Sequence, residues 1–299
     1  MKPGMTSGDL LGRLGVWVSR GSLTPGQAGQ LAALAEDLGY GAFWISGGAA
    51  PGTFEAVQEA LLATSRIVVA TGVINIWIDT PQTVTAGWHD AEAAAPGRLM
   101  VGLGVSHAPL VAARGLGEYA RPLELMAGYL DALDSAPDPL PPGRRLLGAL
   151  GPKMLRLAAQ RSLGAHPYLV TPGHTSQARA QLGPALLAPE QTILVDADPA
   201  RARATARQFL ARYFGMPNYT RNWLRTGGLE PADIAGGGSD RLVDSLVAWG
   251  DGPAIAAAVT AHWAHGADHV CVQALGPLDR VRLAWAEVAA ALPSSDRSQ

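Results

Sequence analysis

Short apolar runs alternate with amphipathic helical segments along almost the whole chain. The first repeat has an apolar strand at 14–18, then a helix with apolar residues at helical spacing up to Gly39, then a second strand at 42–45. Strands that are apolar at consecutive positions are typical of a parallel sheet covered on both faces. The pattern predicts eight strands, at 14–18, 42–45, 67–74, 99–105, 145–150, 166–170, 192–196 and 269–274.

Each predicted strand is followed by at least one helix, which favours a single (β/α)8 TIM barrel in the α/β class, formed as one domain by residues 1–299. Residues 214–252 break the alternation with Gly-rich turns, and we interpret them as a helical insertion before the last strand. The polar tail at 293–299 is expected to fray. In such a barrel, function belongs at the C-terminal ends of the strands.

Charge and cysteine content narrow the functional classes. The chain has 23 Lys and Arg against 25 Asp and Glu, a formal net charge of −2, so neither nucleic acid nor an acidic membrane is an expected partner. Cys271 is the single cysteine, which excludes an intrachain disulfide and fits a reducing compartment. No apolar run is long enough to span a bilayer. We therefore expect a cytoplasmic protein.

Two histidines lie just past predicted strand ends, His107 and His174. An imidazole there can bind a ring carbonyl or take a proton near neutral pH, or it can simply tie down its own loop. No nucleophile elbow, phosphate-binding Walker loop or zinc-spaced set occurs, and no metal is expected. The GLG segment at 102–104 lacks the third glycine of a dinucleotide fingerprint, and its glycines are interpreted as letting a planar ligand approach the backbone.

The segment Thr171–His174 precedes a predicted helix and combines a hydroxyl, a glycine and a helix N-terminus. Backbone amides and the helix dipole at such a place favour an anion. The same composition also fits a plain turn in which Thr175 or Ser176 caps the helix. Lys2 and Lys153 are the only lysines, so a phosphate site must rely on arginine, backbone amides and helix termini.

Several segments together resemble one known family. The chain is similar to the luciferase-like (bacterial luciferase-type) barrels, and specifically to their coenzyme F420-dependent oxidoreductases. The resemblance rests on AEDLGYGAFWIS (35–46), RIVVATGVINIW (66–77), PGRLMVGLGVSHAPLV (96–111), LGPKMLRLAAQRSLGAHPYLVTPGHT (150–175) and GADHVCVQ (266–273).

The resemblance implies a cis peptide bond between Gly72 and Val73 that supports the deazaflavin ring. It places His107 at the position of the family's acid after the fourth strand. The cofactor, F420 or alternatively FMN, is then expected to contact Ser46, Gly47, Gly72, Val73, Gly104, Leu150, Gly151, Thr171, Pro172, Gly173 and His174.

One departure from the family pattern bears on the reaction. The Asp-His pair of the sugar-phosphate dehydrogenases in the family aligns with Gly47 and Gly48, and glycine cannot take the proton of an alcohol. The resemblance therefore favours reduction of an activated C=C or C=O bond, with His107 or water as the proton donor. If His107 donates, activity should fall as pH rises through the imidazole pKa, which is near ~6.5 if the ring is unperturbed.

Two other readings stay open. An FMN-dependent monooxygenase would use a reduced flavin and oxygen, and a non-catalytic barrel would only bind a flavin-like ligand, a reading that Gly47 and Gly48 keep open. In each case the ligand is a small molecule, and we expect a homo-oligomer, most simply a dimer.

Overall fold

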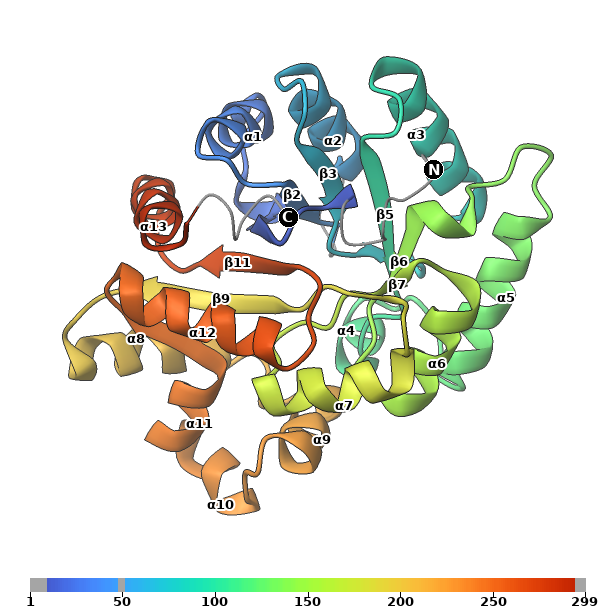
Figure 1. Cartoon of the computed structure of the whole chain (residues 1–299). Coiled ribbons are helices and arrows are strands. Elements are labelled where there is room, and N and C mark those ends of the chain that lie inside the picture. The colour runs from blue at the N-terminus through green and yellow to red at the C-terminus, as the bar shows by residue number, and fades with distance from the viewer. Residues whose placement is uncertain (1–9, 48–51, 294–299) are drawn as a thin grey trace.

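The computed structural model describes residues 10–47 and 52–293 (Figure 1). Within these residues, eleven strands form one parallel sheet. They are β1 (Leu14–Ser19), β2 (Ala42–Ser46), β3 (Val68–Thr71), β4 (Ile74–Asn75), β5 (Leu99–Gly104), β6 (Arg145–Leu147), β7 (Gly164–Ala165), β8 (Leu186–Leu187), β9 (Glu190–Val195), β10 (Val247–Gly250) and β11 (Val270–Ala274).

The sheet curls, and its order is β10-β9-β11-β1-β2-β3-β5-β6-β7-β8, with β4 paired to β5. The chain itself links the end strand β8 to β9, the second strand from the other end of this order, because only two residues separate them. The amide of Glu190 donates to Pro167 O at 2.9 Å, and the amide of Cys271 donates to Pro189 O at 3.1 Å, so this segment has neighbours on both sides. The predicted α/β barrel fold is confirmed.

Helices surround the sheet (Figure 1). The helices that alternate with strands are α1 (Gln27–Asp37), α2 (Thr53–Leu62), α3 (Pro81–Ala94), α4 (Ala108–Ala113), α5 (Pro122–Asp134), α6 (Pro152–Arg161), α7 (Pro172–Leu182), α8 (Pro199–Leu210), α12 (Gly252–Ala264) and α13 (Leu278–Ala291). Three further α-helices lie between α8 and β10: α9 (Pro217–Thr226), α10 (Pro231–Ile234) and α11 (Asp240–Leu246), with a short 3-10 helix at Ala235–Gly237.

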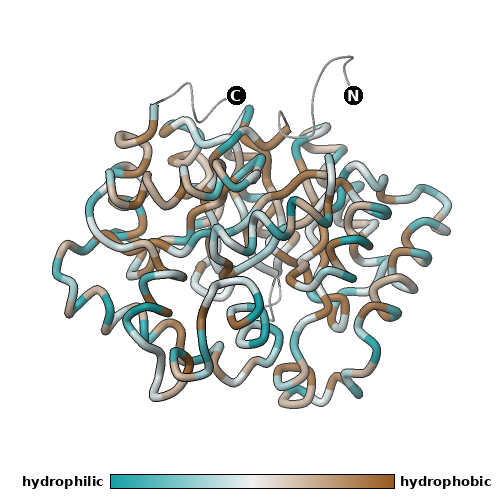
Figure 2. Tube along the Cα trace, turned by 60° about the horizontal axis from the view of Figure 1, so that its bottom comes forward, coloured by the Kyte–Doolittle hydropathy of each residue, from teal (hydrophilic) through white to brown (hydrophobic). Residues whose placement is uncertain are grey.

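The core lies between the strands and these helices. Strand residues such as Phe43, Trp44 and Val69 are fully buried, as expected where both faces of a parallel sheet are covered. In Figure 2, hydrophobic segments of the Cα trace recur in the interior of the molecule, and hydrophilic segments lie mainly along the outer helices and loops. The additional helices have their own apolar cluster around Trp223, which packs with Leu169 and Phe209.

Three predicted elements are corrected. Residues 247–250, expected within the helical insertion 214–252, form β10, because they pair with an edge of β9 that exists only in the folded barrel. The expected strand 67–74 is divided into β3 and β4 at Gly72–Val73. The strand expected at 166–170 occupies 164–165 instead, and the chain then leaves the ladder.

Residues 294–299 of the expected frayed tail lie outside the described residues. That the whole chain folds as one domain stays a prediction.

Candidate functional site at the barrel mouth

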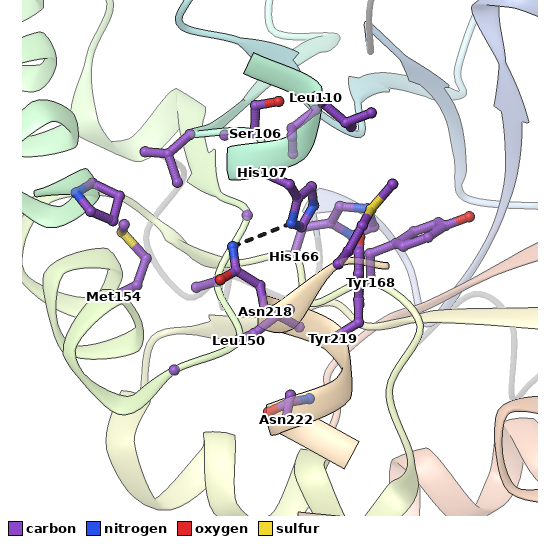
Figure 3. Close-up of a pocket in the computed structure, with 18 of the residues that line it drawn as sticks. Ser106, His107, Leu110, Leu150, Met154, His166, Tyr168, Asn218, Tyr219 and Asn222 are labelled. Atoms are coloured by element: carbon purple, nitrogen blue, oxygen red, sulfur yellow. Dashed lines mark hydrogen bonds between the residues drawn. The ribbon is translucent and has the colours of Figure 1, made fainter. Parts of the chain in front are cut away.

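A cavity of about 980 Å³, called the barrel cavity below, opens among the loops that follow the strands. Its floor includes Trp17 on β1, Ser46 at the end of β2 and Gly72 directly after β3. Its walls come from the loops after β5 and β6 and from helix α9 (Figure 3). The predicted location of the site at the C-terminal strand ends therefore holds a cavity large enough for an organic cofactor.

The Gly72–Val73 peptide bond is cis, as the resemblance implies. Gly72 O accepts a hydrogen bond from Trp17 Nε1 at 3.1 Å. The glycines of β5 make room for this turn of the chain: a Cβ added at Gly104 would lie 2.4 Å from Val73 Cγ2, and one at Gly102 would lie 2.1 Å from Thr71 O. Packing within the barrel therefore requires both glycines, and Gly104 also lines the cavity. That they let a planar ligand approach the backbone stays a prediction.

The structure places six of the eleven expected cofactor residues on the barrel cavity: Ser46, Gly72, Val73, Gly104, Leu150 and Gly151. Gly47 is buried and does not line the cavity, and a Cβ there would be 3.0 Å from both Ile74 Cα and Val73 O. Gly48, the other half of the family's Asp-His position, lies outside the described residues.

The start of α7, residues 171–174, is separate from the barrel cavity. Thr171, Pro172 and Gly173 line a second cavity of about 340 Å³, and a Cβ added at Gly173 would lie 2.7 Å from Thr226 O at the end of α9. Thr171 Oγ1 accepts the amide of His174 at 3.3 Å, so Thr171 caps the helix rather than Thr175 or Ser176.

His174 ties its loop to the neighbouring one. Its ring is buried and lines neither cavity, and Nε2 donates to Leu150 O at 3.0 Å. Burial lowers the pKa of His174 to about 4, so the ring is neutral at neutral pH. Of the two roles that the sequence left open for this residue, the geometry supports the loop-tying one.

The start of α6, in contrast, opens onto the barrel cavity. Its cap residue is Gly151, which has no side chain to accept the first amides of the helix. Arg225 Nη2 donates to Leu150 O at 2.9 Å and to Asn222 Oδ1 at 2.7 Å. Asn222 is 2% exposed and lines the cavity, and its Nδ2 has no hydrogen-bond partner among the described residues. Free amides, an unused amide donor and a guanidinium thus meet at one place suited to an anion.

Charge on the cavity wall has one sign. Among the described residues that line the barrel cavity, none is Asp or Glu. The positively charged side chains there are Arg114, Lys153, Arg212, Arg221 and Arg225. Such a wall attracts anionic ligands and disfavours cationic ones.

His107 lies on the wall of the barrel cavity and is held by α9. Its Nδ1 accepts a hydrogen bond from Asn218 Nδ2 at 3.2 Å (Figure 3), and its ring lies 4.8 Å from that of Tyr219. An amide nitrogen can only donate, so the neutral ring carries its hydrogen on Nε2. Burial lowers the pKa of His107 to about 4. The pKa of His107 is thus perturbed from its ordinary value, and the residue is a neutral hydrogen-bond donor at neutral pH.

Sequence reasoning missed the contribution of α9 and of the first strand. Ser19 at the end of β1 follows from the same strand-end rule that found Ser46. The α9 residues had a signal of their own, since Asn218, Arg221, Asn222 and Arg225 recur at helical spacing and line the cavity together. A polar stripe of this kind on an inserted helix indicates a face that lines a binding site.

Two structural absences apply to the described residues. No group of three or more His, Cys, Asp or Glu side chains is placed to hold a metal ion within 10–47 and 52–293. Over the same ranges, no helix has the length and apolar character needed to cross a bilayer.

Comparisons with solved structures show the fold. An F420-dependent secondary alcohol dehydrogenase, solved with an F420-acetone adduct, is 14% identical with a TM-score of 0.70, covering 95% of this chain and 98% of that one. The coenzyme F420-dependent tetrahydromethanopterin reductase of Methanopyrus kandleri is 15% identical with a TM-score of 0.68, covering 92% and 98%. The oxygenating constituent of 3,6-diketocamphane monooxygenase from Pseudomonas putida, solved with FMN, is 14% identical with a TM-score of 0.66, covering 93% and 97%.

The sequence comparisons identify the family. No curated protein sequence matches the chain. The family described as luciferase-like monooxygenase matches residues 9–269, which is most of the chain. The protein therefore belongs to the luciferase-like monooxygenase family, a family of oxidoreductases and monooxygenases.

Proposed function

We propose that this chain is an F420-dependent oxidoreductase that transfers hydride between the deazaflavin and a small organic substrate, with reduction of an activated C=C or C=O bond favoured. The observation that carries the proposal is the one-signed charge of the barrel cavity, with five cationic side chains and no carboxylate among its described lining residues. Coenzyme F420 joins its ring to a phosphodiester and a tail of glutamate carboxylates, whereas FMN ends in a single phosphate. Several separated cations suit the longer anion better.

The residues present fit such a cofactor. The floor around Trp17 and the cis Gly72–Val73 bond suits a planar ring, and the start of α6 with Asn222 and Arg225 suits its phosphodiester. Lys153 and Arg221 also line the cavity and suit the carboxylate tail. When bound, the deazaflavin would supply or accept the hydride, and the barrel would orient it against the substrate.

His107 and Gly47 favour the direction of reduction. His107 Nε2–H can donate a hydrogen bond to a substrate carbonyl, while the lowered pKa makes the ring a poor base or acid near neutral pH, so water supplies the proton. Gly47 offers no side chain to take a proton from an alcohol, and it does not line the cavity. Alcohol oxidation therefore lacks a base at that position.

An FMN-dependent monooxygenase is the second candidate. One terminal phosphate would satisfy the start of α6 with Asn222 and Arg225, and a structural neighbour of similar coverage was solved with FMN. The two functions differ in what the bound, reduced cofactor does with oxygen.

The test is a pair of equilibrium titrations of the purified protein, one with F420 and one with FMN, followed by exposure of each reduced complex to air. The proposal predicts tighter binding of F420 and a reduced complex that persists in air. Tight FMN binding without F420 binding, followed by rapid reoxidation, would assign the monooxygenase function instead.

A further inference from the structure

His166 has one ring nitrogen whose role is fixed by its surroundings. Nδ1 lies 2.8 Å from Ala188 O, and because a carbonyl oxygen only accepts, Nδ1 carries the ring hydrogen. Nε2 is therefore a bare acceptor. Burial lowers the pKa of His166 to about 4, so this nitrogen remains unprotonated at neutral pH.

This acceptor is unused and faces the floor of the barrel cavity. His166 is 1% exposed, it lines the cavity, and Nε2 has no hydrogen-bond partner among the described residues (Figure 3). A Cβ added at Gly72 would lie 3.1 Å from Nε2, which places the nitrogen beside the cis peptide bond. An unpaired polar atom in such a place costs free energy unless a ligand or water satisfies it.

The ring cannot turn to find another partner. It stacks on Trp44, with ring centroids 4.3 Å apart and an interplanar angle of 20°. Trp44 is itself held by a hydrogen bond from its Nε1 to His269 Nε2 at 3.0 Å. The position and direction of the acceptor are thus set before any ligand arrives, which reduces the cost of binding.

The nearest donors on the floor are already assigned. Trp17 Nε1 donates to Gly72 O, and Tyr168 Oη donates to Gln273 Oε1 at 2.6 Å. The second bond leaves Gln273 Nε2, also on the cavity, as an amide donor. The floor therefore offers both an acceptor and a donor to the edge of a ligand.

We propose that His166 Nε2 accepts a hydrogen bond from the imide N3–H of the cofactor ring and so fixes which end of the ring enters the cavity floor. The inference rests on the proposed function only in that a flavin or deazaflavin ring occupies the barrel cavity. The imide is the one ring N–H of either cofactor in the oxidised state, and it is flanked by two carbonyl oxygens that need donors such as Gln273 Nε2. His166 is a residue that positions the ring and determines specificity.

The test is equilibrium binding of FMN against 3-methyl-FMN, and of the deazaflavin chromophore FO against 3-methyl-FO, to the oxidised protein. Methylation removes the donor, so the wild type should lose about 10-fold or more in affinity. His166→Phe keeps an aromatic ring on Trp44 but has no acceptor, and there methylation should cost less than about 3-fold. His166→Gln, whose amide oxygen can accept, should restore part of the discrimination.

A matched control and the contradictory outcomes complete the design. His265→Phe makes the same change at an exposed histidine after α12 that does not line the cavity, and it should keep the wild-type methylation penalty. Equal affinity of the wild type for methylated and unmethylated rings would overturn the inference, as would an equal penalty in wild type and His166→Phe, which would indicate a steric clash alone. Absence of binding by all four compounds would instead reject the proposed function.

Discussion

The helices that follow β6 and β7 both begin with proline, but their N-termini lie in different surroundings. Both have proline at the first helical position, after Gly151 in α6 and after Thr171 in α7. The Thr171 side chain satisfies one amide of its own helix, whereas Gly151 leaves its amides free. We call the two places the α6 terminus (residues 151–154) and the α7 terminus (residues 171–174).

Helix α9 creates most of the difference between the two termini. Its last residue, Thr226, packs against Gly173 and covers the α7 terminus. Its polar residues Asn222 and Arg225 face the barrel cavity beside the α6 terminus. Two places that the sequence analysis assigned to cofactor contact thus differ in the structure. The α6 terminus opens onto the barrel cavity, whereas the α7 terminus packs against α9 beside the second cavity.

Removing the guanidinium beside the α6 terminus should have the largest effect. Hydrogen bonds to charged groups contribute about 1.5–3 kcal/mol, so Arg225→Gln should weaken F420 binding by about 10- to 100-fold. The measurement is the dissociation constant from fluorescence titration. Arg156→Gln is the matched control, because Arg156 is an exposed arginine on α6 that does not line the cavity. Equal effects of the two changes would show that only the overall charge matters.

His107 extends the comparison from binding to turnover. His107 lies on the barrel cavity, so His107→Ala should lower kcat/KM by about 10-fold through the loss of one hydrogen-bond donor to the substrate. His107→Asn should keep most of the activity, because its amide can still donate. Steady-state kinetics of both variants provide the measurement. A large loss in the Asn variant would mean that His107 transfers a proton rather than donating a hydrogen bond.

The α7 terminus should respond in stability and not in binding. Thr171→Val removes the side-chain acceptor of the His174 amide, which should cost about 1 kcal/mol of unfolding free energy. The F420 dissociation constant should stay within about 2-fold of the wild type, since this terminus is outside the barrel cavity. Denaturant unfolding and the same titration measure the two effects. A binding loss comparable to that of Arg225→Gln would place the anion at α7 as well.

The smallest expected effect concerns pH. The folded-state pKa of His107, about 4, lies below its ordinary value of 6.5, so the ring stays neutral between pH 8 and 6 and activity should be flat there. Activity should decline only as pH falls toward the folded value. The stability contribution has the same sign: it is lost as pH falls from 6.5 toward 4, because the unfolded chain then binds more protons. A kcat/KM profile that falls as pH rises through 6.5 would show that the imidazolium is the active form.

The barrel could be predicted because its strands are apolar at consecutive positions, which depends on local sequence alone. Strand β10 could not, because residues 247–250 follow α11 without a turn signal, and their pairing partner is an edge of β9 that tertiary structure provides. The cis bond at Gly72–Val73 was accessible through the family resemblance and not through periodicity.

Within the site, the predictable part is the set of strand ends. Ser46, Gly72 and Gly104 lie at or near the ends of predicted strands, the family resemblance named them as cofactor contacts, and they line the barrel cavity. The lowered pKa of His107 was not predictable, because it arises from burial beside Tyr219 on α9, far away in the sequence. The difference between the α6 terminus and the α7 terminus was not predictable either, because it also depends on α9.

The most direct test of the account compares F420 with FO, the same chromophore without the phosphodiester and glutamate tail, by fluorescence titration over a range of salt concentrations. If the α6 terminus and the cationic wall hold the tail, F420 should bind at least about 10-fold more tightly than FO at low salt. The difference should shrink as salt screens the charges, while FO binding should change little. Equal affinity of F420 and FO at every salt concentration would contradict the assignment of this wall to the cofactor tail.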